Sequence, residues 1–206
     1  ILDKILKEKI FKYFLLFIKQ TDIIIFSDYG KGVFLDNLFC QKLIKAALKK
    51  KKKIIVDPKG NHFEKYKGSF FITPNTKEAF KATKINPINN NLTEKCGKII
   101  INNEWSDNVL LTRGANGLSI IQANKNEHIK SNTEEIFDVT GAGDTVIALF
   151  SAAIAAENNY IDSANFANIG ASIVVKKSGT ASLTSAELIK SINSKNLIKI
   201  LNKNNI

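Results

Sequence analysis

A glycine-rich turn followed by a carboxylate is the stretch of this sequence most able to do chemistry. Residues 138–144 read Asp-Val-Thr-Gly-Ala-Gly-Asp, and the alanine-rich apolar run that follows predicts a helix over 145–156. The amides of Gly141, Ala142 and Gly143 would lie at the helix N-terminus, where the first N–H groups lack intrahelical acceptors and bind anions. Glycine also permits the backbone angles, and the close approach, that a phosphoryl group needs.

Asp144 stands one residue further along, where a carboxylate would repel a bound phosphate. That position makes sense if Asp144 faces a second reactant and takes a proton from its hydroxyl group. The arrangement then predicts a phosphoryl transferase. The alternative is that Asp144 is an acid favoured by the helix dipole and that the glycines only form a tight turn.

The rest of the chain predicts an α/β fold. Short, unbroken β-branched runs are typical of strands that are buried on both faces of a parallel sheet. We expect strands at 22–27, 53–57, 70–73 and 109–112, and a hairpin from 118–122 into 128–130. Helical spacing covers 2–19, 35–50, 62–66, 145–156, 161–176 and 185–192, whereas the Asn- and Pro-containing segment 86–93 predicts a surface loop.

Each predicted strand ends in a polar motif, at 27–32, 57–60, 73–75 and 112–114. Since open α/β sheets bind ligands at the carboxyl ends of their strands, the four motifs are expected at one edge. Asp28 and Lys59 are the candidates there for contacts to a phosphate or a sugar. Solvation of such strand-end side chains is the competing interpretation.

The motif at 138–144 resembles the signature of the ribokinase-like (PfkB-type) carbohydrate kinases. The resemblance implies a three-layer α/β sandwich with a mostly parallel sheet, and a reaction that uses ATP and Mg²⁺. It assigns the anion hole to Gly141, Ala142 and Gly143, and the role of catalytic base to Asp144, which also contacts the sugar.

Asn75 and Glu78 match the Asn-x-x-Glu element that this family places near magnesium and the phosphates, so the resemblance implies a metal contact through water. The same spacing is also a helix capping box, as at Thr184 and Glu187. Both interpretations of Asn75 and Glu78 remain open.

Further nucleotide contacts are implied by the same resemblance. The turn after the strand at 109–112 corresponds to the family's phosphate-lining turn and contributes Thr112, Arg113, Gly114 and Gly117, although a plain hairpin would look similar. The family encloses adenine around the last long helix. That segment contributes Asn168, Ala171 and Gly179.

Taken together, the motifs from 23 to 187 resemble one branch, the kinases of D-glycero-D-manno-heptose 7-phosphate, which serve lipopolysaccharide core synthesis. The branch implies phosphorylation of the anomeric hydroxyl in the cytoplasm. We expect one kinase domain over 1–193, without the family's first strands and β lid, and a polar tail at 194–206. The lid implies a homodimer in the intact family protein. A kinase for another sugar or nucleoside, and a non-catalytic ATP-binding remnant, are the alternatives.

Composition argues against other classes of function. The formal charge is +11, but every basic residue except Arg113 is lysine, and these lysines are scattered, so we do not expect nucleic-acid binding. No apolar run has membrane-spanning length. Cys40, Cys96, His62 and His128 lack the spacing of metal ligands, and the cysteines are expected to be reduced thiols in the core.

Overall fold

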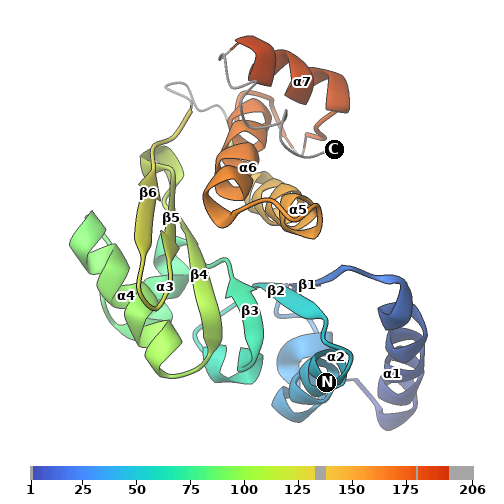
Figure 1. Ribbon diagram of the computed structural model, residues 1–206. Coiled ribbons are helices and arrows are strands. Elements are labelled where there is room, and N and C mark those ends of the chain that lie inside the picture. Colours follow the sequence, from blue (N-terminus) through green and yellow to red (C-terminus); the bar gives the residue numbers. More distant parts are fainter. Residues whose placement is uncertain (1, 133–137, 180, 195–206) are drawn as a thin grey trace. The chain divides into compact units, whose positions relative to one another are not determined.

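The computed structural model describes residues 2–132, 138–179 and 181–194 (Figure 1). These residues divide into two compact units. The first unit contains Ile1–Leu111 and Ile121–Asn126, and the second contains Thr112–Ile120 and Glu127–Ile206. Most of the predicted polar tail, from residue 195 onward, lies outside the described residues.

The helices and strands alternate along most of the chain. In order they are α1 (Lys4–Phe17), η1 (Ile18–Gln20), β1 (Ile23–Ser27), η2 (Val33–Leu35), α2 (Asn37–Lys49), β2 (Lys53–Asp57), η3 (Phe63–Tyr66), β3 (Ser69–Ile72), α3 (Thr76–Thr83), α4 (Asn90–Asn102), β4 (Ser106–Thr112), η4 (Gly114–Asn116), β5 (Leu118–Ile121), β6 (Asn126–Ile129), α5 (Ala142–Ala155), α6 (Tyr160–Val174) and α7 (Ser185–Ser194). The predicted α/β class is confirmed.

The strands follow one another in the sheet in chain order, from β1 to β6, and β1 to β4 are parallel. Ser27 pairs with Asp57 at the ends of β1 and β2, and Val56 pairs with Ile72 near the ends of β2 and β3. The polar motifs that follow these three strands therefore begin side by side at one edge, as the sequence predicts.

The expectation that every strand is buried on both faces is wrong for β1. Phe26 packs between Phe14 and Phe34, with ring centroids 6.3 and 4.9 Å away. Ile25 points to the opposite face, because successive side chains of a strand alternate, and it remains 41% exposed.

The core of the first unit lies between its helices and the sheet. Its fully buried aromatic residues include Phe63 and Tyr66, and Trp105 packs edge-on against Phe63. Cys40 and Cys96 are both buried free thiols, as predicted. Burial raises the pKa of Cys40 to about 12, so this thiol is protonated and unreactive at neutral pH.

The surface loop predicted for 86–93 is wrong in its second half, because α4 begins at Asn90. The side chain of Asn89 accepts a hydrogen bond from the Leu92 amide at 2.9 Å and caps the helix. The asparagine run is therefore the start of a helix that the sequence did not predict. The helix α3 was not predicted as an element either, although the capping-box interpretation of Asn75 and Glu78 implies a helix start there. Asparagine favours turns and helix N-caps alike, so the run by itself does not separate the two.

In the second unit, α5, α6 and α7 form a helical group (Figure 1). A Cβ added to Gly170 of α6 would lie 2.0 Å from Leu149 of α5, so glycine permits the close approach of these helices. Ile169 of α6 packs with Leu188 and Ile192 of α7. Among the described residues, none of the helices is long and apolar enough to cross a membrane.

Candidate functional site

The glycine-rich turn of the second unit leads directly into α5, as the sequence predicts. Gly141 is the N-cap and has a left-handed backbone with φ +80°, which glycine adopts without strain. Its carbonyl accepts hydrogen bonds from both the amide and the hydroxyl of Thr145, at 3.0 and 2.9 Å. The turn is thereby fixed to the first turn of the helix.

The backbone of this turn is open to a ligand. A Cβ added at Gly141 or Gly143 would meet no atom within 4 Å. Neither glycine amide donates to another residue of the described chain, whereas the Ala142 amide donates to the Val139 carbonyl at 3.2 Å. Two of the three predicted amides are thus available to a ligand, and anion binding by Gly141, Ala142 and Gly143 remains a prediction.

Asp144 lies exposed in the first turn of α5. A carboxylate there is accessible to a reactant from solvent, as a base that acts on a bound hydroxyl must be. Its role as base remains a prediction.

Asp138, at the start of the same motif, was not among the predicted site residues. Its carboxylate accepts hydrogen bonds from the Thr140 amide at 2.9 Å and the Gly179 amide at 3.2 Å. Hydrogen bonds from Thr140 are the main cause that lowers the pKa of Asp138, so the group is ionised at neutral pH. Its place at the head of the motif is the sequence signal that could have identified it. Gly179, predicted near adenine, therefore also anchors the glycine-rich turn.

The turn after β4 is built around two glycines with different tasks. Gly117 has φ +81°, and an added Cβ would lie 2.1 Å from the Ile129 carbonyl oxygen, so glycine is required for packing. Gly114, with φ +56°, faces open space. The Arg113 amide donates to the Gly117 carbonyl at 2.8 Å, and its guanidinium donates to the Asn116 carbonyl at 3.2 Å. Burial lowers the pKa of Arg113.

The predicted adenine residues lie on α6. Asn168 is buried, and its amide nitrogen donates to the Lys130 carbonyl at 2.7 Å, which ties α6 to the residues after β6. Ala171 is partly buried one turn later. The structure thus gives Asn168 a structural task, and adenine contacts by Asn168 and Ala171 remain predictions, as do nucleotide contacts by Thr112.

In the first unit, Asp28 follows β1 and is only 4% exposed. One carboxylate oxygen accepts from the Gly30 amide at 2.7 Å, and the other accepts from Lys65 and Tyr66, each at 2.6 Å. Burial by itself raises the pKa of Asp28, but the hydrogen bonds from Lys65, Tyr66 and Gly30 outweigh it, and the pKa is lowered. The predicted substrate contact of Asp28 therefore competes with three internal partners.

Lys59, which follows β2, lies close to Glu78 in the first turn of α3. The Lys59 ammonium lies 3.8 Å from a Glu78 carboxylate oxygen, and the Lys59 side chain is 59% exposed. Asn75 and Glu78 form the capping box of α3, in which each side chain accepts from the other's amide, at 2.9 and 3.0 Å. The interpretation of Asn75 and Glu78 as a helix capping box is therefore confirmed. The hydrogen bond from the Asn75 amide occupies one Glu78 carboxylate oxygen, and the other oxygen is the one nearest Lys59.

No group of three or more metal-ligating side chains occurs among the residues that the structure describes. Mg²⁺ keeps several waters and commonly binds through one or two carboxylates together with substrate phosphates. Glu78, acting through water, fits that donor chemistry.

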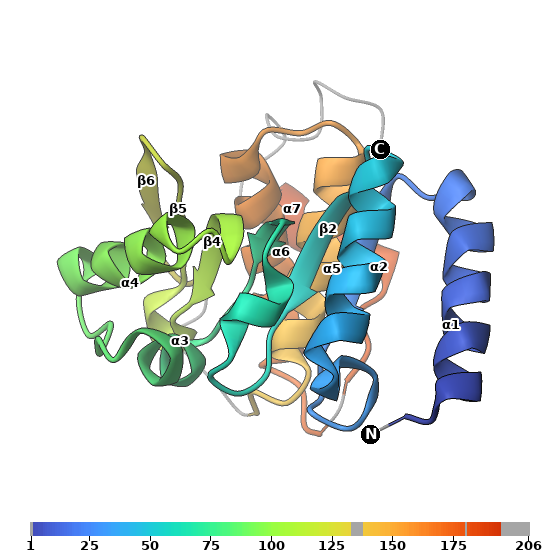
Figure 2. The same ribbon diagram turned by 90° about the horizontal axis from the view of Figure 1, so that it is seen from below.

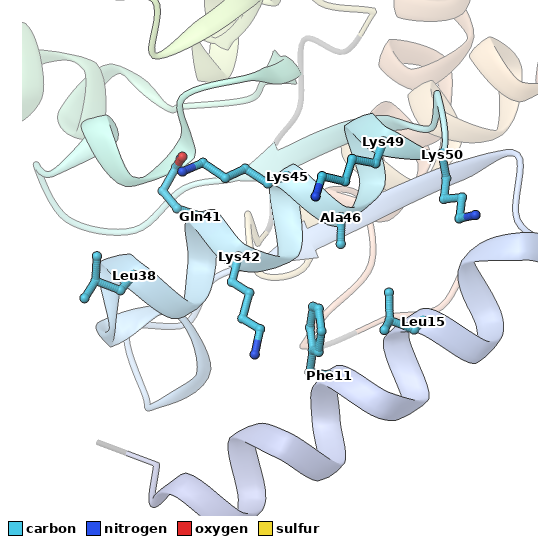
Figure 3. A pocket seen from close by; sticks show the side chains of 9 residues that line it. All are labelled: Phe11, Leu15, Leu38, Gln41, Lys42, Lys45, Ala46, Lys49 and Lys50. Carbon is cyan, nitrogen blue, oxygen red and sulfur yellow. The ribbon is translucent and has the colours of Figure 1, made fainter.

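A cavity of about 570 Å³ lies elsewhere in the first unit, between α1 and α2, which run alongside each other (Figures 2 and 3). Phe11 and Leu15 of α1 face Lys42 and Ala46 of α2 across it, and the Lys42 ammonium lies 4.1 Å from the Phe11 ring centroid. None of the predicted site residues lines this cavity.

Solved structures show which fold this is. Arabidopsis thaliana ribokinase, in a complex with ribose and ATP, superposes with a TM-score of 0.77 at 18% identity, over 86% of this chain and 58% of that one. Escherichia coli phosphofructokinase-2, in a complex with potassium, gives 0.77 at 17% identity, over 90% and 62%. The fold is ribokinase-like.

The sequence comparisons are more specific. The model of the pfkB family of carbohydrate kinases matches residues 6–187. Bifunctional protein HldE of Mesorhizobium japonicum is 36% identical over 187 residues, 91% of this chain and 38% of that protein. HldE of Haemophilus influenzae is 38% identical over 181 residues, 86% of this chain and 37% of that protein. The chain spans little more than a third of these relatives, and it belongs to the pfkB family of carbohydrate kinases.

The buried ion pair of the first unit gives a stability prediction with a matched control. Lys65→Met leaves the buried Asp28 carboxylate without its cation, so we expect a loss of about 3–5 kcal/mol in the free energy of unfolding by urea at pH 7. Lys67→Met breaks the Lys67–Glu104 pair, which is exposed, and should change the stability little. Equal losses in the two variants would show that the buried pair contributes no more to stability than the exposed one.

The same pair predicts a pH dependence. Because the pKa of Asp28 is lowered in the folded protein, the pair stabilises above the unfolded pKa, about 4, and this stabilisation is lost as the pH falls through the lower folded value. We therefore expect the difference in the free energy of unfolding between the unmodified protein and Lys65→Met, measured with urea at several pH values, to become smaller in acid.

Proposed function

We propose that this protein is an ATP-dependent sugar kinase, which transfers the γ-phosphoryl group to an alcohol. The observation that carries the proposal is the open glycine backbone at the N-terminus of α5, followed at once by the exposed Asp144, in a chain of the pfkB family. An open anion site with a carboxylate beside it provides the two functions that phosphoryl transfer to a hydroxyl requires.

The chemistry assigned to these groups is electrostatic. The amides of the glycine-rich turn, with Ala142 included in the proposal, stabilise negative charge on the transferred group, and Asp144 takes the proton of the attacking hydroxyl. Mg²⁺, when bound, would neutralise phosphate charge, and Glu78 and Asn75 would hold its water shell. Lys59 would contact a phosphate. Asn168, Ala171 and Gly179, with the turn at 112–117, are proposed nucleotide contacts.

For the substrate we propose D-glycero-D-manno-heptose 7-phosphate, phosphorylated at the anomeric hydroxyl in the cytoplasm on the route to ADP-heptose for lipopolysaccharide. Two observations support this choice. The motifs from residue 23 to 187 resemble that branch, and the relatives at 36–38% identity are named HldE.

A panel of sugars tests the substrate. We expect ADP release from Mg-ATP with heptose 7-phosphate and a much slower reaction with ribose, fructose 6-phosphate and adenosine. Preference for another acceptor would replace the proposed sugar and keep the kinase. Binding of Mg-ATP, seen by calorimetry, without transfer to any acceptor would identify an ATP-binding protein and overturn the kinase proposal.

Asp144→Asn tests the base. The amide keeps the size of the side chain but cannot accept the proton, so turnover should fall by at least about 10²-fold while ATP affinity is retained. Asp162→Asn is the matched control, because Asp162 is likewise an acid in the first turn of a helix, α6. Full activity of Asp144→Asn would show that Asp144 is not the catalytic base.

Gly143→Ala tests the anion site. Alanine suits a helix and meets no atom within 4 Å here, so the fold should be at least as stable. The new methyl group would occupy the space proposed for the phosphoryl group, and turnover should fall about 10²-fold, as when a preorganised donor is lost. Ala152→Ser, on an exposed part of the same helix, should retain full turnover. Unchanged activity of Gly143→Ala, with a normal melting temperature, would place the phosphate elsewhere.

A further inference from the structure

The Tyr66 hydroxyl joins two of the strand-end turns in the first unit. It donates to an Asp28 carboxylate oxygen at 2.6 Å and accepts from the Lys59 amide at 3.2 Å. Asp28 belongs to the turn after β1 and Lys59 to the turn after β2. A single hydroxyl therefore acts as donor to one turn and as acceptor to the other.

The Tyr66 side chain has little freedom to move. It is fully buried and packs against Phe63, with ring centroids 6.1 Å apart, and Phe63 in turn packs against Trp105 at 6.1 Å. Burial, with the hydrogen bond to Asp28, raises the pKa of Tyr66, so the hydroxyl keeps its proton. The oxygen that holds the Lys59 amide is thus fixed by the core.

Asp28 completes the network. Besides Tyr66 it holds Lys65, which is 7% exposed and also donates to the Phe34 carbonyl at 3.1 Å, and it holds the Gly30 amide. With both carboxylate oxygens engaged inside the protein, Asp28 is better suited to fix loops than to bind a sugar.

Lys59 is the member of this group whose charged side chain reaches solvent. Its amide is held by Tyr66, and its ammonium lies 3.8 Å from Glu78 at the edge where the strand-end motifs gather. Gly30 packs close to it, since a Cβ added to Gly30 would lie 3.5 Å from the Lys59 Cγ. The position of the ammonium therefore depends on the turn that Tyr66 anchors.

We infer that Tyr66 and Asp28 are positioning residues, which fix the turn after β2 so that Lys59 presents its ammonium to a phosphate of the substrate or nucleotide beside Glu78. The inference deepens the proposed function and rests on it for the identity of the ligand. It replaces a direct substrate contact by Asp28 with an action through Tyr66 and Lys59.

Amide hydrogen exchange tests the anchoring without any activity. In Tyr66→Phe the ring remains in the core and only the hydroxyl is lost. Exchange at the Lys59 amide, measured by NMR in the full chain, should therefore become about tenfold faster, which is the change expected when one hydrogen bond is lost. Thr93→Val is the matched control, because it removes another buried hydroxyl, in α4, that donates to the Asn89 carbonyl at 2.8 Å. In Thr93→Val, the exchange rate of the Lys59 amide should be the same as in the unmodified protein. Equal exchange in the unmodified protein and Tyr66→Phe would overturn the inference.

Kinetics test the consequence. Tyr66→Phe should raise the KM for ATP or for the phosphorylated sugar about tenfold and change kcat less, since a binding contact rather than the base is misplaced. In a Lys59→Ala background, Tyr66→Phe should cause no further change in KM. Thr93→Val should leave both constants unchanged. If Tyr66→Phe and Lys59→Ala have fully additive effects, Tyr66 does not act through Lys59, and the inference fails.

Failure of the proposed function gives a different result. An unmodified protein that transfers no phosphate to any acceptor overturns the kinase, while the exchange experiment still decides whether Tyr66 holds the Lys59 turn. Asp28→Asn gives an independent check on the network, because an amide at this position weakens the hydrogen bond from Tyr66 and should also quicken exchange at Lys59.

Discussion

The strand-end edge of the first unit depends on one buried carboxylate. Asp28 holds an ammonium, a phenol and a backbone amide within 2.7 Å; the amide belongs to its own turn, and the other two partners come from η3. A parallel sheet brings the ends of β1, β2 and β3 together but leaves the turns beyond them without ladder hydrogen bonds. The carboxylate supplies the contacts that the sheet no longer provides, and the turns that carry Lys59 and Gly30 acquire defined conformations.

Glycine shows why a motif alone does not separate structure from function. Gly117 and Gly170 lie where an added Cβ would be 2.1 Å or less from a neighbouring atom, so packing explains them. Gly141 and Gly143 have empty space around them, and packing gives no reason for the missing side chain at Gly143, where alanine would suit the helix better. A ligand site needs such open space, which supports the proposed anion site without establishing it.

The sequence predicts the strands of the parallel sheet well, because β-branched runs and terminal polar residues are local signals. It also predicts a helix at the glycine-rich turn, although α5 begins at Ala142, three residues before the predicted start. It fails for α4, since the Asn89 cap and a turn share the same residue preferences. The partners of Asp28 were equally out of reach: Lys65 and Tyr66 lie in η3, almost forty residues along the chain, and a lysine in a polar segment is ordinarily solvated. Only the three-dimensional fold shows that this lysine is buried.

A buried ion pair is costly to form, and an apolar pair of similar size is often as stable. Stability alone therefore does not explain why Asp28 and Lys65 are charged. An apolar replacement could fill the same volume, but it could not accept the hydrogen bonds of the Gly30 amide and the Tyr66 hydroxyl, nor donate to the Phe34 carbonyl. The buried Tyr66 hydroxyl would then lose its acceptor, the Gly30 amide and the Phe34 carbonyl would lose their protein partners, and the turns would relax toward water. The charges are thus best understood as fixing which conformation the turns adopt, and the geometry of Lys59 beside Glu78 follows from that choice.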